Sequence, residues 1–157
     1  QAVSRGLGDV YKRQTKDGKV TAWKSEHWGT DGPKGGTIDG NQMPYVFDPP
    51  NKHVISRGIS TDCGPNRAWR APNHPQLCAI TDTALTDLAA KLKMDPIDLY
   101  EANLDSLDRV AKENGALYSA ELDRAAELMD WKKKWHAPGK RNTKSSVRRG
   151  VLSLIHI

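Results

Sequence analysis

Apolar residues in the first half of the chain recur with a period of two, the pattern of β-strands. Residues 18–28 alternate loosely between apolar and polar positions and are rich in Val, Thr and Trp. Residues 45–47 and 53–59 have the same character and are separated by two prolines and an asparagine. Residues 29–40 contain five glycines and one proline, which predicts a flexible loop. We therefore expect the first half to be mainly β.

In the second half the apolar period lengthens to three or four residues, the pattern of α-helices. After Pro75 the apolar stripe comprises Leu77, Ile80, Ala84, Leu88 and Leu92. Thr81 and Asp87 fall on the other faces of this helix. Asp95 and Pro96 are of the types preferred at the N-cap and first position of a helix, and they predict a short second helix through Leu104.

A third helix is expected further along, capped by Ser119. Its apolar stripe would be Leu122, Ala125, Ala126 and Met129, and we expect Trp131 and Trp135 to close it against the core. The predicted fold class is α+β, with strands in the first half of the chain and helices in the second.

The segment between these halves, residues 62–76, has a composition unlike that of an ordinary connection. Three prolines and a glycine stiffen it, and it also carries Trp69, Arg67 and Arg70. The segment ends where a helix begins, so free N–H groups there favour an anionic ligand. It can therefore be a loop that presents a guanidinium and its own amides, or a rigid turn that only packs Trp69.

Residues 67–104 resemble the large molybdenum-cofactor-binding subunit of the xanthine dehydrogenase and aldehyde oxidase family. Residues 69–76 read Trp-Arg-Ala-Pro-Asn-His-Pro-Gln, against the family pattern aromatic-Arg-Ala-Pro-Gly-His-Pro-Gln. An amphipathic helix, a Met-Asp-Pro step and a short helix ending in Asn-Leu follow in the family order. A weaker match lies upstream, at residues 44–51.

The resemblance implies a partial molybdopterin-binding domain over residues 15–136 and a molybdopterin-dependent oxidoreductase as the parent enzyme. Such enzymes hydroxylate an aldehyde or an N-heterocycle with oxygen from water and pass electrons to iron-sulfur centres. By resemblance Arg70 contacts the cofactor and Ala71 lies close by, while Pro72 is a substrate-pocket candidate. Family members give molybdenum no side-chain ligand. Their carboxylate base belongs to a region outside this chain, so the chain alone is expected to be inactive and to have no catalytic residue of its own.

The implied cofactor is molybdenum-molybdopterin, with the cytosine dinucleotide form as one alternative. The implied partners are iron-sulfur and FAD subunits or domains and a small-molecule substrate, without nucleic acid. Where purine-oxidising members have Gly-Phe after the arginine, this chain has Ala71-Pro72, which removes an aromatic wall and favours an aldehyde or another small carbonyl or heterocycle. Asn73 replaces the usual glycine and tolerates a positive φ better than other residues.

Both ends of the chain have the appearance of translated sequencing adapter. Residues 9–14 and 152–157 correspond to the two strands of one transposon-type adapter end. We therefore expect residues 1–14 and 152–157 to have no consistent structure and to pack on nothing. The chain would then be an internal fragment without its natural N-terminus, and its compartment, cytoplasmic or periplasmic, stays open.

Removal of these ends changes the charge of the chain. The net charge of +5 falls to +3, because the ends hold three basic residues and one acidic residue. Eight of the remaining cations lie in residues 132–149, which contain no acid, and residues 137–151 have the composition of a basic linker. The alternative function is a small basic binding domain for an acidic or nucleic-acid partner.

Other classes of protein are excluded more simply. Cys63 and Cys78 are too few for a disulfide framework or for a zinc site of their own. No run of eighteen apolar residues is present, so no membrane span is expected.

Overall fold

The structure, a computed structural model, describes residues 8–37, 40–65, 70–71, 73–107 and 113–137. Its strands are β1 (Gly8–Gln14), β2 (Val20–Thr30) and β3 (Lys52–Ile59). Its helices are α1 (His74–Leu92), α2 (Pro96–Glu101), α4 (Gly115–Leu128) and α5 (Trp131–Lys134), with short 3-10 helices at Gly40–Gln42 and Leu104–Ser106. The order, strands first and helices second, confirms the α+β class.

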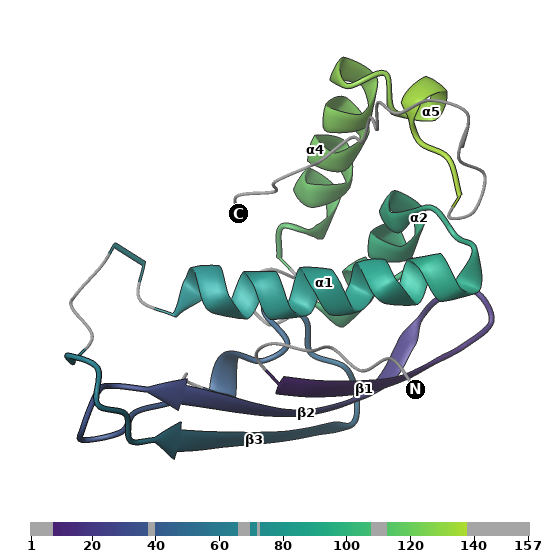
Figure 1. Cartoon of the computed structure of the whole chain (residues 1–157). Helices are drawn as coiled ribbons and strands as arrows, with labels where there is room; N and C mark the ends of the chain where they lie inside the picture. The colour runs from purple at the N-terminus through teal and green to yellow at the C-terminus, as the bar shows by residue number, and fades with distance from the viewer. Residues whose placement is uncertain (1–7, 38–39, 66–69, 72, 108–112, 138–157) are drawn as a thin grey trace, which may run out of the picture.

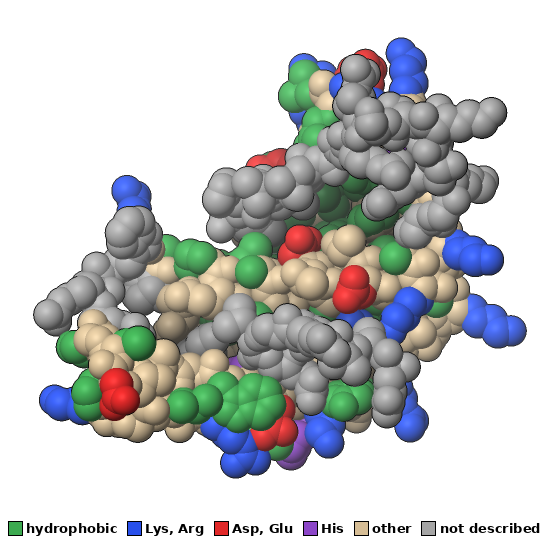
Figure 2. Space-filling view, in the orientation of Figure 1, with side chains coloured by type: hydrophobic (Ala, Val, Ile, Leu, Met, Phe, Trp, Pro, Cys, Tyr) green, Lys and Arg blue, Asp and Glu red, His purple; other side chains and the backbone are tan. Residues whose placement is uncertain are grey.

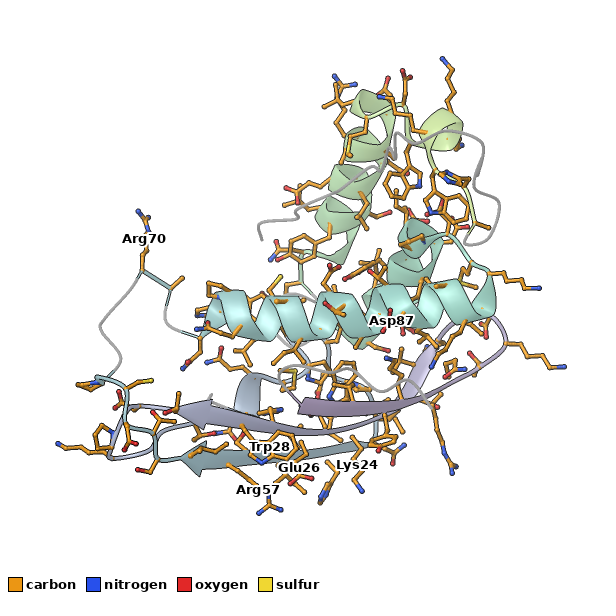
Figure 3. All side chains as sticks on the ribbon, viewed as in Figure 1. Lys24, Glu26, Trp28, Arg57, Arg70 and Asp87 are labelled. Atoms are coloured by element: carbon orange, nitrogen blue, oxygen red, sulfur yellow. The ribbon has the colours of Figure 1, made fainter. Side chains whose placement is uncertain are left out.

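The strands form one sheet, and α1 lies across one of its faces (Figure 1). The strand order is β1-β2-β3, in which β1 and β2 are antiparallel and β2 and β3 are parallel. Side chains such as Lys24, Trp28 and Arg57 project from the face opposite α1 (Figure 3). In the space-filling view basic side chains gather along this side of the molecule (Figure 2). The sheet therefore has one face covered by α1 and one face open in the described part of the chain.

The expectation that residues 1–14 pack on nothing is wrong for residues 8–14. These residues form β1, whose partners in β2 run from His27 back to Val20. Val10 packs against the core, whereas Tyr11 is exposed. The free edge of β2 offers unpaired N–H and C=O groups, which can pair with any segment whose apolar and polar residues alternate. This explains why residues 8–14 pair with β2. The adapter origin of this sequence stays a prediction, and residues 1–7 and 152–157 lie outside the described residues.

The core lies between α1 and the sheet. Trp23, Leu77 and Leu99 are almost completely buried, and Met43 and Phe47 join them from the connection between β2 and β3. On α1 the buried face includes Thr81, Leu85 and Ala89, whereas the predicted Ile80 and Leu92 are only partly buried. Thr81 is therefore on the core face and not on an outer one. The Thr81 hydroxyl accepts a hydrogen bond from the Tyr45 N–H at 2.8 Å, so the hydroxyl stays paired although it is buried.

Residues 45–47 are not the predicted strand. They form a turn in which Val46 has a φ of 59°, and Phe47 makes a single isolated bridge with Leu107. Met43-Pro44 is a cis peptide bond. The prolines on both sides of this segment have no backbone N–H and so cannot donate the hydrogen bonds that a strand needs. The apolar side chains are therefore buried by a turn and not by a strand.

The helical half follows its local signals at α2 but not at α4. Asp95 caps α2 by accepting the Ile97 N–H at 2.9 Å, and Pro96 occupies the first helical position, as predicted. The third helix begins at Gly115, four residues before the predicted cap Ser119. Trp131 is buried, as predicted, whereas Trp135 is only partly buried.

None of the helices in the described ranges is both long and apolar enough to cross a membrane.

Candidate functional site

The predicted site lies on the connection between β3 and α1, residues 60–73, here called the Arg70 loop. Arg70 is exposed, and its side chain points away from the rest of the molecule (Figure 3). Five ion pairs occur among the described residues, and none of them includes Arg70 or Asp62. The guanidinium is thus available to a ligand. An ion pair between Arg70 and a neighbouring acid would instead have indicated that the guanidinium stabilises the loop.

The backbone after Arg70 turns tightly into α1. Ala71 has a φ of 56° and Asn73 a φ of 67°, both in the left-handed region. The expectation that Asn73 can stand where the family has glycine is met by this conformation. Ala71 at positive φ costs on the order of 1 kcal/mol, which the surrounding contacts must offset. Pro72 and residues 66–69, which include Trp69 and Arg67, lie outside the described residues.

The start of α1 offers fewer free amides than an ordinary helix N-terminus. The His74 N–H donates to the Ala71 carbonyl at 3.2 Å, and the Leu77 N–H donates to the Asn73 carbonyl at 2.9 Å. Pro75 has no N–H. Within the described residues, Gln76 is therefore the first-turn residue whose N–H has no backbone partner and can meet an incoming anion.

The helix end of the Arg70 loop is anchored by a contact that the sequence did not reveal. His74 Nδ1 lies 3.0 Å from the Tyr45 hydroxyl, and the two rings meet edge to face with centroids 5.4 Å apart. Tyr45 in turn donates its backbone N–H to Thr81 of α1. The upstream match at residues 44–51 was the available signal, but it does not show which partner Tyr45 would take.

The strand end of the Arg70 loop is also anchored, here by the glycine-rich connection after β2. The Thr61 N–H donates to the Gly32 carbonyl at 3.0 Å, and the Ser60 hydroxyl donates to the Pro33 carbonyl at 2.7 Å. The hydroxyls of Thr30 and Thr61 are 3.0 Å apart. The segment predicted as a flexible connection therefore has a specific packing partner.

The described residues contain no group of three or more His, Cys, Asp or Glu side chains placed to hold a metal ion. Cys63 is an exposed free thiol, and Cys78 is a half-buried one whose pKa is raised by burial and by the nearby Asp82 carboxylate. The candidate donors are instead the Arg70 guanidinium on the loop and the Gln76 amide at the start of α1. They fit anionic or oxo groups of a cofactor and not a metal ion itself.

Comparison with known proteins places this loop in a family. Residues 13–104 match the molybdopterin cofactor-binding domain family. Because this match spans more than half of the chain and includes Arg70, the chain belongs to that family. The resemblance of residues 67–104 had predicted this membership.

Particular relatives share part of their length with the chain. It is 28% identical over 130 residues to the aldehyde oxidoreductase molybdenum-binding subunit PaoC of Escherichia coli O157:H7, over 79% of this chain and 18% of that one. Among solved structures it is similar to Cu,Mo-CO dehydrogenase in the carbon monoxide reduced state, with 18% identity, a TM-score of 0.46 and coverage of 78% and 19%. Reconstituted CO dehydrogenase from Oligotropha carboxidovorans gives 18% identity, a TM-score of 0.44 and coverage of 76% and 18%. The chain spans about a fifth of the length of these relatives.

Proposed function

We propose that the chain is a segment of the molybdenum-cofactor-binding subunit of a molybdenum hydroxylase. The observation that carries this proposal is the exposed guanidinium of Arg70, which makes no ion pair among the described residues and stands on a loop of the matched family region. When bound, the molybdopterin cofactor supplies the redox and oxygen-transfer chemistry. The residues of this chain bind and orient it.

Arg70 has the chemistry for this role. Its planar fork carries five N–H donors and a permanent charge, so it can hold an anionic or oxo group through two parallel hydrogen bonds. The Gln76 N–H, at the start of α1, has no backbone partner among the described residues and is a second candidate donor beyond the turn at Asn73. Ala71, next to the guanidinium, brings the backbone of the turn close to the same ligand.

We further propose an aldehyde or an N-heterocycle as the substrate, water as the oxygen source and iron-sulfur centres as the electron acceptors. Two observations bear on the substrate, of which the first favours an aldehyde or another small carbonyl or heterocycle over a purine and the second favours an aldehyde. Ala71-Pro72 lacks the phenylalanine that would stack on a planar purine, and the relative PaoC is an aldehyde oxidoreductase subunit. The proposed cofactor is molybdenum-molybdopterin, with its cytosine dinucleotide form as one alternative. We place FAD on a partner subunit or domain and the carboxylate base in a part of the protein outside this chain.

The test is Arg70→Lys in the complete subunit, with Arg57→Lys as the matched control. Lysine keeps the charge but loses the fork, so we expect Arg70→Lys to lower bound molybdenum and turnover severely. Arg57 is also exposed but is paired with Glu26 on the open face of the sheet, so its replacement should leave both unchanged. Full molybdenum content and near-normal turnover in Arg70→Lys, with only a lower melting temperature, would show that the loop is scaffold.

A further inference from the structure

We propose that the glycine segment, residues 29–36, holds the start of the Arg70 loop in position by direct backbone packing, with Gly32 as the positioning residue. The proposal rests on the cofactor-binding function proposed above for Arg70. It assigns a role to a segment that sequence patterns indicate only as a flexible connection.

Gly32 lies against the backbone of residues 63–65. A Cβ built on Gly32 would come within 2.7 Å of the Cys63 carbonyl oxygen, 2.9 Å of the Pro65 nitrogen and 3.0 Å of the Gly64 carbonyl carbon. All three are backbone atoms, so no flexible side chain can move aside. Gly32 also has a φ of +64°, which favours glycine. Any side chain here would therefore displace the loop backbone or the glycine segment.

The same segment also contacts the end of β3 closely. A Cβ on Gly58 would lie 3.1 Å from the Gly36 carbonyl oxygen and 3.3 Å from its nitrogen. Gly36 in turn forms an isolated antiparallel bridge with Gly29. Glycines on both sides of this contact let the two backbones approach closely, and a Cβ on Gly58 would require a shift of a few tenths of an ångström.

Hydrogen bonds fix the two segments in register. The Gly32 carbonyl accepts the Thr61 N–H, and the Pro33 carbonyl accepts the Ser60 hydroxyl. The ends of β2 and β3, from which the segments leave, lie at the same end of the sheet (Figure 1). Packing and hydrogen bonding thus act on the first residues of the Arg70 loop, which reaches Arg70 five residues after Pro65.

With the far end of the loop held by the contact between Tyr45 and His74, both ends are fixed. Because Arg70 follows Pro65 by only five residues in the sequence, we infer that its position depends on where residues 63–65 lie. A shift of even one ångström at a binding group is enough to weaken a directional hydrogen bond severely.

The experiment compares Gly32→Ala with Gly35→Ala in the complete subunit. Gly35 has a φ of +69°, close to that of Gly32, but a Cβ there meets no atom closer than 3.5 Å. The two variants thus share the strain of alanine at positive φ and differ in the backbone clash. Ser60→Ala, which removes the hydroxyl bond to Pro33, is a second and milder variant.

Two quantities are measured, the amide hydrogen exchange of residues 58–65 and the molybdenum bound per subunit. For Gly32→Ala we expect exchange of this segment to become on the order of tenfold faster while α1 keeps its protection. Bound molybdenum should fall below about half, since a displaced guanidinium loses directional hydrogen bonds. Ser60→Ala should change both in the same direction but less, and Gly35→Ala should change both far less than Gly32→Ala, because it carries the strain of positive φ without the backbone clash.

Unchanged exchange in Gly32→Ala, or equal loosening in Gly35→Ala, would overturn the inference without touching the proposed function. Faster exchange with full molybdenum would also overturn it, provided that Arg70→Lys loses the metal. If Arg70→Lys keeps its molybdenum as well, the proposed function itself has failed. Exchange of α1 that rises together with that of residues 58–65 would also overturn the inference, because the effect of Gly32 would then be global and not confined to the start of the Arg70 loop.

Discussion

Single buried polar side chains determine how the parts of this domain are joined. Asn103, two residues after the end of α2, is 1% exposed. Its side-chain oxygen accepts the Val20 N–H at 2.7 Å, and its amide donates to the carbonyls of Gly18 at 3.1 Å and Leu99 at 2.7 Å. One side chain thus pairs three buried backbone groups and connects α2 to the turn between β1 and β2.

Asn103→Ala should lower the free energy of unfolding by about 2–4 kcal/mol, because it leaves buried backbone groups unpaired as well as removing the bonds. Urea unfolding measures this. Asn51→Ala is the control, since exposed Asn51 makes one side-chain bond, to the Thr21 carbonyl, and should cost less than about 1 kcal/mol. Equal losses in the two variants would show that the Asn103 network contributes little.

His27 is a second buried polar residue, but its ring is unpaired. It is 1% exposed on β2, and neither ring nitrogen has a hydrogen-bond partner in the described part of the chain. Its neighbour in β3, Ser56, also has a buried hydroxyl without a partner in that part. Burial lowers the pKa of His27 below the usual value for histidine.

This shift predicts a loss of stability in mild acid. Below pH ~6.5 the unfolded chain takes up a proton that the buried ring of His27 resists, so the free energy of unfolding falls as pH decreases. Between the folded and the unfolded pKa of His27, the free energy of unfolding changes by up to about 1.4 kcal/mol per pH unit. Below the folded pKa and above pH ~6.5, His27 adds no pH dependence. Urea midpoints between pH 7.5 and 5.5 measure it. His27→Leu should remove most of the slope, whereas His53→Leu, at an exposed position, should keep it. A slope unchanged by His27→Leu would contradict the assignment.

At the scale of elements, local signals predict well where the determinant is local. Asp95 and Pro96 define the start of α2 because capping depends on residues two or three positions apart. The turn at Asn73 follows from its tolerance of positive φ. Thr81 and Tyr45 could not be placed in this way. Their positions depend on a hydrogen bond between segments 36 residues apart, which periodicity does not contain.

Trp131 shows the same dependence between distant elements. Its indole N–H lies 3.0 and 2.8 Å from the two carboxylate oxygens of Asp95, which joins α5 to the start of α2. Trp131→Phe keeps most of the buried ring but loses this bond to a charged group. We expect a loss of about 1.5–3 kcal/mol in the free energy of unfolding.

The control for this variant is Trp135→Phe, at a partly buried indole for which the described residues offer no hydrogen-bond partner. It should lower the free energy of unfolding by less. If Trp135→Phe costs as much as Trp131→Phe, the bond to Asp95 is not what holds α5 in place.

At the scale of the whole molecule, the family was predictable from the loop motif, whereas the cofactor-binding role of Arg70 stays a prediction and the geometry of the loop was not predictable. The loop sequence and the resemblance indicated Arg70, and the family match includes that residue. The two anchors of the loop were not predictable, because they lie in the glycine segment and at Tyr45, both distant in sequence from Arg70. The pairing of residues 8–14 with β2 was also missed, since an open sheet edge selects its partner through backbone groups and alternation alone.

The last prediction is that the chain alone binds no molybdenum cofactor. Its best donor is one exposed guanidinium, and hydrogen bonds to charged groups contribute on the order of 1.5–3 kcal/mol each. Two such bonds from Arg70 would contribute about 3–6 kcal/mol, whereas association costs about 4–15 kcal/mol in lost freedom and a micromolar complex needs about 8 kcal/mol beyond that cost. The remaining contacts must come from protein beyond this segment, which spans about a fifth of the length of its relatives. Metal analysis of the purified 157-residue chain, produced in cells that make the cofactor, should therefore find molybdenum far below one atom per chain, and its hydroxylase activity should be absent. Stoichiometric molybdenum would mean that the Arg70 loop and its two anchors form a complete binding site by themselves.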